Sequence, residues 1–429
     1  MVQRRVIIPV IVLIVAAGVA IGIWRAVEAQ KASASSFAAV NPSASASPPG
    51  SSAPNPVYVA PISSSPASTA PVTQSSLPLY PTASTSVPAV SSTSSSPSPT
   101  CTKISVRRSW DALSDAEQSQ FANAVNQLKK GPKVPGNTFT FDDFVNIHYT
   151  DAMNAHGVAA FLPWHRVYIK IYEEHLQRIN SNITLPYWDW SNLKVSQSPQ
   201  LSSIWGPYWG THTYIGNNCL QDGIAASWVK MYPTQLAGQC IKRQWTTATT
   251  ISAFTPQNVI DQLDNVTSFA QFAPSLEAFH GYPHVNAGGL NGDFTNPRYS
   301  PNDPIFFLHH SNIDRLWNNW QQVNTSNVFN YGGHTPTGAQ ATLQDPLTIF
   351  GVKVSDAMDS YNQMCVSYEP PPSSLASDIP TVLASPEALT EDAIQAFWPA
   401  GHINVTFIRQ LEAQTNQFVE AFNTANAAS

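Results

Sequence analysis

Histidines are the residues of this sequence whose type and spacing are best suited to metal chemistry. His148, His156 and His165 lie eight and nine residues apart, with the first and last in predicted helices and the middle one in a loop at Gly157. His280 and His284 lie four residues apart, so both imidazoles fall on one face of one helix. A single helical histidine is usually structural and an isolated pair arises by chance, but two such groups in one chain predict a metal site.

A third histidine for the second group comes from the pair His309-His310, about thirty residues further on. Neither group has a Cys, Asp or Glu at ligand spacing. Zinc and iron sites usually include thiolate or carboxylate ligands, whereas imidazole alone suits copper. The residues therefore favour two copper ions.

The elements that would position these histidines are predominantly helical. A capping-box spacing from Ser114 to Glu117 lies in the first predicted helix, and helix-breaking residues separate it from the next. Helices are predicted at 109–130, 141–149, 163–179, 274–284 and 304–323, and long loops at 193–244. No run of alternating strands is present. The predicted fold is mainly α: a helical bundle holding a dinuclear copper site, with long loops and only minor β structure.

Two segments resemble the copper regions of the tyrosinase and catechol oxidase (polyphenol oxidase) family, in its short fungal-like form. The first is Phe-Leu-Pro-Trp-His-Arg at 161–166, followed by Leu-Pro-Tyr-Trp-Asp-Trp at 185–190. The second is Asp-Pro-x-Phe-x-x-x-His-x-x-x-Asp at 303–314. The resemblance spans about 110–368, and it implies a type 3 pair of copper ions with O2 as co-substrate.

The resemblance also assigns roles to individual residues. Copper A would be held by His148, His156 and His165, and copper B by His280, His284 and His310. His310 is chosen over His309 because only His310 has the four-residue step to Asp314 that the motif requires. His309 is then a supporting or structural residue. Arg166 and Asp314 are expected behind the ligands, as an ion pair or by fixing imidazole tautomers, with an ordinary surface salt bridge as the alternative.

The reaction follows from a departure from the family pattern. Glu277 stands where the family has a water-holding glutamate, but the partner position after His280 holds Gly281 instead of asparagine. We therefore expect oxidation of o-diphenols to o-quinones, with O2 reduced to water and monophenol hydroxylation weak or absent. Full tyrosinase activity, o-aminophenol oxidation and haemocyanin-like O2 binding without turnover stay open as alternatives.

Two further departures concern His156 and the C-terminus. No cysteine lies between His148 and His165, so the thioether found in some relatives is absent and His156 is expected to be held by packing alone. Only a short extension, 369–429, follows the dicopper domain at 101–368. Its predicted helices near 386–398 and 407–422 are expected to dock on the core, and a role as a plug over the copper mouth is left open.

The first hundred residues indicate the compartment. Residues 1–29 are a signal peptide or a signal anchor, because Arg4 and Arg5 precede an apolar run at 6–24 that is long enough to tether the chain to a membrane. Residues 30–100 are a Ser/Pro/Ala/Thr-rich stalk without a single charge after Lys31, which is typical of disorder. Both readings place the catalytic domain in the secretory pathway, outside the cell or on its surface.

Two features agree with this compartment. Glycosylation sequons start at Asn182, Asn265, Asn324 and Asn404. Four cysteines allow three pairings, of which Cys219–Cys240 with Cys101–Cys365 is favoured. The net charge of −6 includes no basic block, which argues against a nucleic-acid partner, and no obligate protein partner is indicated. The expected partners are a small phenolic substrate and O2.

Overall fold

The computed structural model describes the folded part of the chain. The described residues are 101–130, 137, 139–211, 218–245, 253–289, 291–372, 380–398 and 403–427. The apolar run at 6–24 and the stalk at 30–100 lie outside them, so the predictions of a tether and of disorder stay predictions. Within the described residues, no helix is long and apolar enough to cross a membrane.

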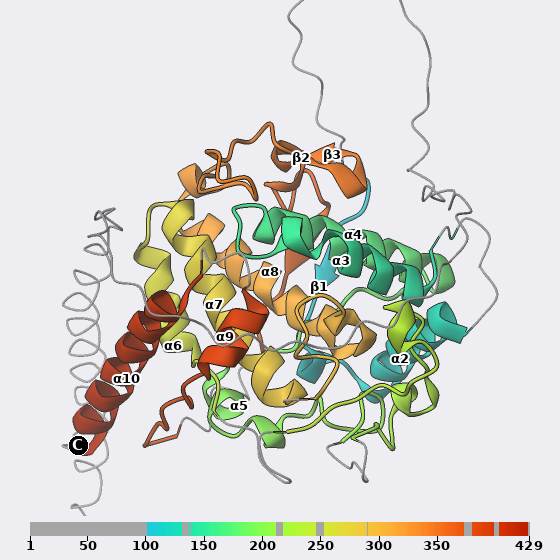
Figure 1. Cartoon of the computed structure of the whole chain (residues 1–429), viewed down its shortest axis with the longest axis horizontal. Coiled ribbons are helices and arrows are strands. Elements are labelled where there is room, and N and C mark those ends of the chain that lie inside the picture. Colours follow the sequence, from blue (N-terminus) through green and yellow to red (C-terminus); the bar gives the residue numbers. More distant parts are fainter. Residues whose placement is uncertain are drawn as a thin grey trace, which may run out of the picture. The chain divides into compact units, whose positions relative to one another are not determined.

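The fold is mainly helical, as predicted, and the long helices α3, α4, α7 and α8 form its centre (Figure 1). The helices are α2 (Asp115–Lys130), α3 (Phe141–Ala155), α4 (Phe161–Ile179), α5 (Leu193–Gln197), α6 (Gln257–Ile260), α7 (Phe269–Gly288), α8 (Ile305–Val323), α9 (Glu391–Phe397) and α10 (Val405–Ala427). α4 packs against α8, where the rings of Tyr172 and Phe307 stack with centroids 3.6 Å apart. The described residues between α5 and α6 form loops, turns and short 3-10 helices, in agreement with the long loops predicted for 193–244. The start of that range is corrected, because the Asn192 side chain caps the short helix α5 there.

Local side-chain capping explains where the first helices begin. The Ser114 backbone N–H donates to the Glu117 carboxylate at 2.8 Å, so α2 begins at Asp115. The predicted start at 109 is wrong, because Ser109 caps a separate 3-10 turn. Thr140 and Asp143 form a capping box that starts α3. α3 continues beyond the predicted end at 149, which brings His156 directly after its last residue.

α7 is longer than the predicted 274–284 although it contains Pro274 and Pro283. Proline inside a helix costs about 3 kcal/mol, which is why the sequence suggests a shorter element. Nearly all side chains of α7 are buried. Apolar burial at about 25 cal/mol per Å² along twenty residues outweighs that cost.

Strands are short accessories. β1 (Ser105–Arg107) pairs in parallel with β4 (Val366–Tyr368), and β2 (Pro346–Leu347) pairs antiparallel with β3 (Val352–Lys353). The β1–β4 pairing joins the two ends of the dicopper domain, and these ends are also linked covalently.

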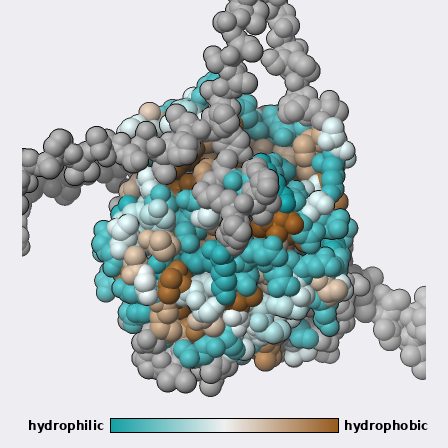
Figure 2. All heavy atoms as spheres, turned by 90° about the vertical axis from the view of Figure 1, so that its right-hand side faces the viewer, coloured by the Kyte–Doolittle hydropathy of each residue, from teal (hydrophilic) through white to brown (hydrophobic). Residues whose placement is uncertain are grey.

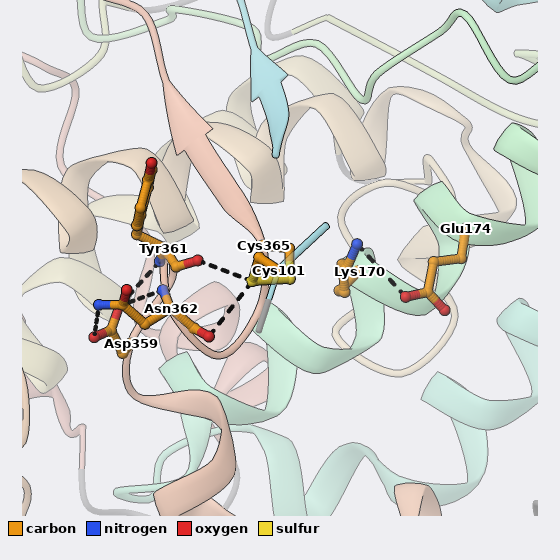
Figure 3. Close-up of a disulfide and its surroundings, with 7 residues drawn as sticks. All are labelled: Cys101, Lys170, Glu174, Asp359, Tyr361, Asn362 and Cys365. Carbon is orange, nitrogen blue, oxygen red and sulfur yellow. Dashed lines mark hydrogen bonds and ion pairs between the residues drawn. A yellow bond between two sulfur atoms is a disulfide. The ribbon is translucent and has the colours of Figure 1, made fainter. Parts of the chain in front are cut away.

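Both disulfides have the pairing favoured from the sequence. Cys101 is bonded to Cys365 and Cys219 to Cys240. Figure 3 shows the first of these beside the turn that carries Asn362. The face of the molecule in Figure 2 is mainly hydrophilic, with small separate hydrophobic patches. All four sequon asparagines are exposed, so solvent access excludes none of them as a glycan acceptor.

Candidate metal centre

The first histidine cluster is built by α3, α4 and the turn between them. His148 lies in the middle of α3, His156 follows its last residue, and His165 lies in the second turn of α4. Gly157 has a φ of +67°, a conformation that glycine adopts at little cost, and it turns the chain directly after His156. One nitrogen from each ring lies within 4.8 Å of the others, and all three side chains are buried.

The second cluster is built by α7 and α8. His280 and His284 stand one helical turn apart on α7, and His309 and His310 are consecutive on α8. Potential ligand nitrogens from all four rings lie within 4.8 Å of one another, and all four side chains are buried. The structure thus brings together every predicted ligand, and it adds His309 to the second group.

His310 lies between the two clusters, whereas His309 also faces residues behind the second one. The His310 ring stacks on that of His165 with centroids 4.2 Å apart, and it lies 5.0 Å from the His280 ring. The His309 ring lies 5.8 Å from Trp190 and 5.6 Å from Phe294. The His309 ring also lies 4.5 Å from that of His284 and 5.2 Å from that of His280. The choice of His310 as the ligand therefore stays a prediction, which rests on its four-residue step to Asp314.

Backbone carbonyls orient most of the histidine rings. In each case the ring's Nδ1 lies at hydrogen-bond distance from a carbonyl oxygen, which leaves Nε2 as the candidate ligand atom. The pairs are His148 with Arg298 at 2.9 Å, His156 with Ala152 at 3.1 Å, His165 with Phe161 at 2.8 Å, His280 with Glu277 at 2.9 Å and His284 with Phe294 at 2.6 Å. The expectation that packing alone holds His156 is therefore wrong.

The opposite nitrogens show that these residues fit a metal. Within the described structure, the buried Nε2 atoms of His148, His165, His280 and His284 have no hydrogen-bond partner. An unpaired buried nitrogen costs about 1–3 kcal/mol, so a group of them at one point is a costly arrangement unless a metal binds there. Burial also lowers the pKa of His280 to about 3 and that of His156 to about 4, which keeps the rings neutral, as ligands must be.

A buried ion pair ties together the two helices that carry His165 and His310. Arg166 of α4 donates through Nε to Asp314 of α8 at 2.5 Å, and both side chains are at most 4% exposed. The surface-bridge alternative is therefore excluded. Of the two roles predicted for this pair the structure shows the ion pair, while backbone carbonyls orient the imidazoles of the five proposed ligands other than His310.

Arg107 was not predicted, although it joins the same network. From β1 it donates to Glu173 at 2.8 Å and lies 3.4 Å from Asp314. A lone arginine in a three-residue strand has no periodic neighbour, so the sequence gives no signal for it. The pairing of β1 with β4 brings it into the core, where it joins α4 to α8.

Glu277 and Gly281 lie on α7 beside the second cluster. The Glu277 carboxylate accepts a hydrogen bond from the backbone N–H of Gly157 at 2.7 Å, so it joins the His156 turn to α7. Burial raises the pKa of Glu277 to about 8, and hydrogen bonding to Gly157 opposes part of that rise. A Cβ added at Gly281 would meet the Trp398 ring at 2.5 Å, so an indole fills the space that a side chain at this position would take.

Aromatic rings that the sequence analysis missed surround the second cluster. Phe294, from the loop after α7, lies 4.2 Å from the His284 ring. Phe397, from α9, lies 5.5 Å from His280 and 5.3 Å from His284. Neither has a motif that marks it: Phe294 lies in a loop without periodicity, and Phe397 comes from a segment distant in sequence.

The fold and site define a helical protein with two histidine clusters suited to a copper pair, and comparison with known proteins identifies its family. A family model described as the common central domain of tyrosinase matches residues 138–323. The tyrosinase-like protein phomQ1' of Diaporthe leptostromiformis is 33% identical over 264 residues, which cover 54% of this chain and 67% of that protein. Tyrosinase ustQ of Aspergillus flavus is 31% identical over 297 residues, covering 63% and 81%.

A solved structure agrees with the fold. A polyphenol oxidase from Thermothelomyces thermophila superposes with a TM-score of 0.51 at 21% identity, over 62% of this chain and 89% of that one. The chain belongs to the tyrosinase family, and its cofactor is the type 3 pair of copper ions of that family.

Proposed function

We propose that this protein oxidises o-diphenols to o-quinones with O2 as the oxidant, and that it hydroxylates monophenols weakly. The enzymes among its relatives support oxidoreductase chemistry in general. The finer assignment depends on one observation. Beside Glu277 the chain has Gly281, which offers no side chain to hold a water, and the Glu277 carboxylate is engaged by the Gly157 N–H.

The six proposed ligands would hold the copper pair as neutral imidazoles. Bound there, copper supplies the electron transfer between the phenol and O2. The chain fixes the ring orientations through the carbonyl hydrogen bonds and excludes water through an apolar shell. The Phe306 ring, 4.2 Å from His310, and the Phe161 ring, 4.9 Å from His280, are part of that shell.

The reaction requires little from acid–base groups of the protein. Each o-diphenol that becomes an o-quinone loses two electrons and two protons, so two diphenols together supply the four electrons and four protons that reduce one O2 to two waters. Hydroxylation of a monophenol needs in addition a base that accepts the phenolic proton before the ring binds. The engaged Glu277 and the missing side chain at Gly281 are poorly suited to that additional step.

The test is oxygen uptake by the copper-loaded full-length chain with catechol, tyrosine and 2-aminophenol in parallel. The ratio of the rates is the readout, because a ratio does not depend on the concentration of active enzyme. We expect catechol to be oxidised much faster than tyrosine. Equal rates without a lag would overturn the proposal, faster 2-aminophenol turnover would favour aminophenol oxidase activity, and two bound coppers without uptake would favour O2 binding alone.

We also propose that the protein acts in the secretory pathway, outside the cell or at its surface. The supporting observations are the apolar run at 6–24, the two disulfides and the four exposed sequons. Loss of apparent mass on treatment of the natively expressed protein with an endoglycosidase would support this, and a cytosolic, unglycosylated protein would overturn it.

A further inference from the structure

One proposed ligand of copper B is oriented by a loop and not by its own helix. Three of the other ligand rings lie against carbonyls of the helical turn before them, three or four residues earlier in the chain. His284 instead lies 2.6 Å from the Phe294 carbonyl, in the segment 291–303 before α8, here called the ligand loop. The regular structure of this loop is one 3-10 turn, Ser300–Asn302. The position of the Phe294 carbonyl therefore depends on contacts from outside the loop.

A buried ion pair supplies the first of these contacts. The Lys230 Nζ lies 2.7 and 2.9 Å from the two carboxylate oxygens of Asp293, and both side chains are 2% exposed. Water and salt screen such a pair far less than a surface pair. Asp293 directly precedes Phe294, so the ammonium group fixes the ligand loop one residue before the carbonyl that orients His284. Lys230 belongs to the segment 218–245, here called the clamp segment.

Backbone contacts reinforce this anchor. The Lys242 N–H donates to the Asp293 carboxylate at 2.7 Å, and the Lys242 carbonyl accepts from the Asp293 N–H at 2.8 Å. Where α7 ends, a Cβ added at Gly289 would stand 1.7 Å from the Gln244 carbonyl oxygen, so the two backbones touch there without room for a side chain. The clamp segment thus contacts the chain on both sides of the turn that leads from His284 to Phe294.

The clamp segment is itself fixed at both of its ends. The Cys219–Cys240 disulfide closes it covalently around Lys230. Arg243 donates to both carboxylate oxygens of Asp303 at 2.7 and 2.8 Å, and both side chains are at most 1% exposed. Asp303 is the last residue of the ligand loop. The two ends of that loop are therefore held by one closed segment.

We propose that Lys230 is a positioning residue for copper B: through Asp293 it holds the Phe294 carbonyl against Nδ1 of His284. This contact fixes the ring orientation in which the buried Nε2, which has no hydrogen-bond partner among the described residues, is available to the metal. The inference goes beyond the proposed function, because it concerns copper binding whichever phenol is oxidised. It differs from a purely structural role in one respect: loss of Lys230 should weaken one copper and not the other.

His148, a proposed ligand of copper A, provides the internal comparison. Its Nδ1 lies 2.9 Å from the carbonyl of Arg298, which belongs to the same ligand loop. Arg298 has an anchor of its own, because its guanidinium lies 4.4 Å from the centre of the Tyr149 ring and donates to the Tyr149 carbonyl at 3.3 Å. Tyr149 directly follows His148 on α3. Loss of Lys230 should therefore affect the orientation of His284 and leave that of His148 unchanged.

The test measures the copper affinity of each site separately in the full-length protein. The background His156→Ala retains the ligands of copper B, and His280→Ala retains those of copper A. The Cu(II) dissociation constant is determined in each by competition with a chromophoric chelator, before and after Lys230→Met is introduced. Lys242→Met is the matched control, because it removes the same charge from the same segment and keeps the backbone bonds to Asp293.

We expect Lys230→Met to weaken copper B about tenfold or more, as loss of a partner behind a metal-bound histidine does, and to weaken copper A less than about threefold. The electron paramagnetic resonance spectrum of Cu(II) at site B should change as well, because it depends on the orientation of the imidazoles. Lys242→Met should leave both affinities unchanged. Unchanged affinity for copper B, or an equal loss at both sites, would overturn the proposal, since a pair that only stabilises the fold acts on both sites alike.

Two substitute measurements keep the test decisive. If Lys230→Met does not fold because a buried carboxylate is left without its partner, Lys230→Met/Asp293→Asn removes both charges and is judged by the same criterion. If a single-site background binds no copper, chelator extraction of the six-histidine protein replaces it. One copper should then leave Lys230→Met at a chelator concentration about tenfold lower than in the wild type, and the other at an unchanged one. Release of both coppers together would overturn the proposal.

The positioning role and the proposed function fail independently. Catechol oxidation is not among these readouts, so a protein that binds copper in the predicted way without oxidising catechol would refute the function and leave the role of Lys230 standing. Rapid catechol oxidation with an unchanged copper B affinity in Lys230→Met would refute the positioning role and leave the function standing.

Discussion

Replacement of Asp314 by alanine should destabilise the protein more than any surface charge change on the same helices. One carboxylate joins three elements: it accepts from Arg166 of α4 at 2.5 Å, lies 3.4 Å from Arg107 of β1, and accepts from the Tyr368 hydroxyl of β4. Both arginines are 1% exposed, so the variant leaves buried positive charge without its partner. Breaking a buried pair in this way costs about 3–5 kcal/mol.

That cost converts to a shift in the unfolding temperature. Unfolding entropy is about 2.1 cal/mol/K per residue, so roughly 300 folded residues give about 0.6 kcal/mol per kelvin. The expected fall in Tm is therefore about 5–8 °C for Asp314→Ala. Arg107 keeps its bond to Glu173, which favours the lower half of this range. Differential scanning calorimetry of the copper-free protein measures the shift without a contribution from the metal.

Glu174→Ala is the matched control. Glu174 pairs with Lys170 on α4 at 3.5 Å, and its side chain is 38% exposed, so its loss should cost less than about 1 kcal/mol, or under 2 °C (Figure 3). If Asp314→Ala lowered Tm no more than this control does, the buried network would be shown not to hold α4 against α8, and the reasoning would be refuted.

Three further predictions address the ligands, the disulfide and the substrate class. His156→Ala should abolish stable binding of one copper and leave the other, as metal analysis after dialysis would show; retention of both would remove His156 from the ligand set. The Cys101–Cys365 bond closes a loop of over 260 residues, and its loss should lower the free energy of unfolding by about 2–5 kcal/mol. The double variant Cys101→Ser/Cys365→Ser should therefore have a Tm about 3–8 °C lower. An unchanged Tm would contradict this prediction. Gly281→Asn combined with Trp398→Ala should raise the tyrosine-to-catechol rate ratio above that of Trp398→Ala alone. The reason is that asparagine restores a water-holding amide once the indole is gone. An unchanged ratio would show that position 281 does not select the substrate.

The sequence predicts the centre of this fold well because the metal site imposes strong local patterns. A four-residue step on one helix fixes His280 and His284 on the same face, and the helix-loop-helix spacing around His156 defines the first cluster before any tertiary contact is known. The capping signals of Ser114 and Glu117 are equally local. Each of these features depends on neighbours within about ten residues.

The parts that the sequence did not predict depend on contacts between distant segments. Phe397 lies more than a hundred residues after His284, and only the folding of the C-terminal extension onto α7 places it there. The same holds for Trp398, whose meaning depends on the absence of a side chain at Gly281. The orientation of His156 by the Ala152 carbonyl was missed for another reason: a backbone acceptor has no sequence signal.

The central claim is that six histidines hold two coppers, with His310 and not His309 completing the second site. An anomalous-difference map at the copper absorption edge, from crystals of the copper-loaded full-length protein, tests it most directly. The account predicts two peaks, one coordinated by His148, His156 and His165 and the other by His280, His284 and His310. A single peak, or a second copper coordinated by His309 in place of His310, would contradict it.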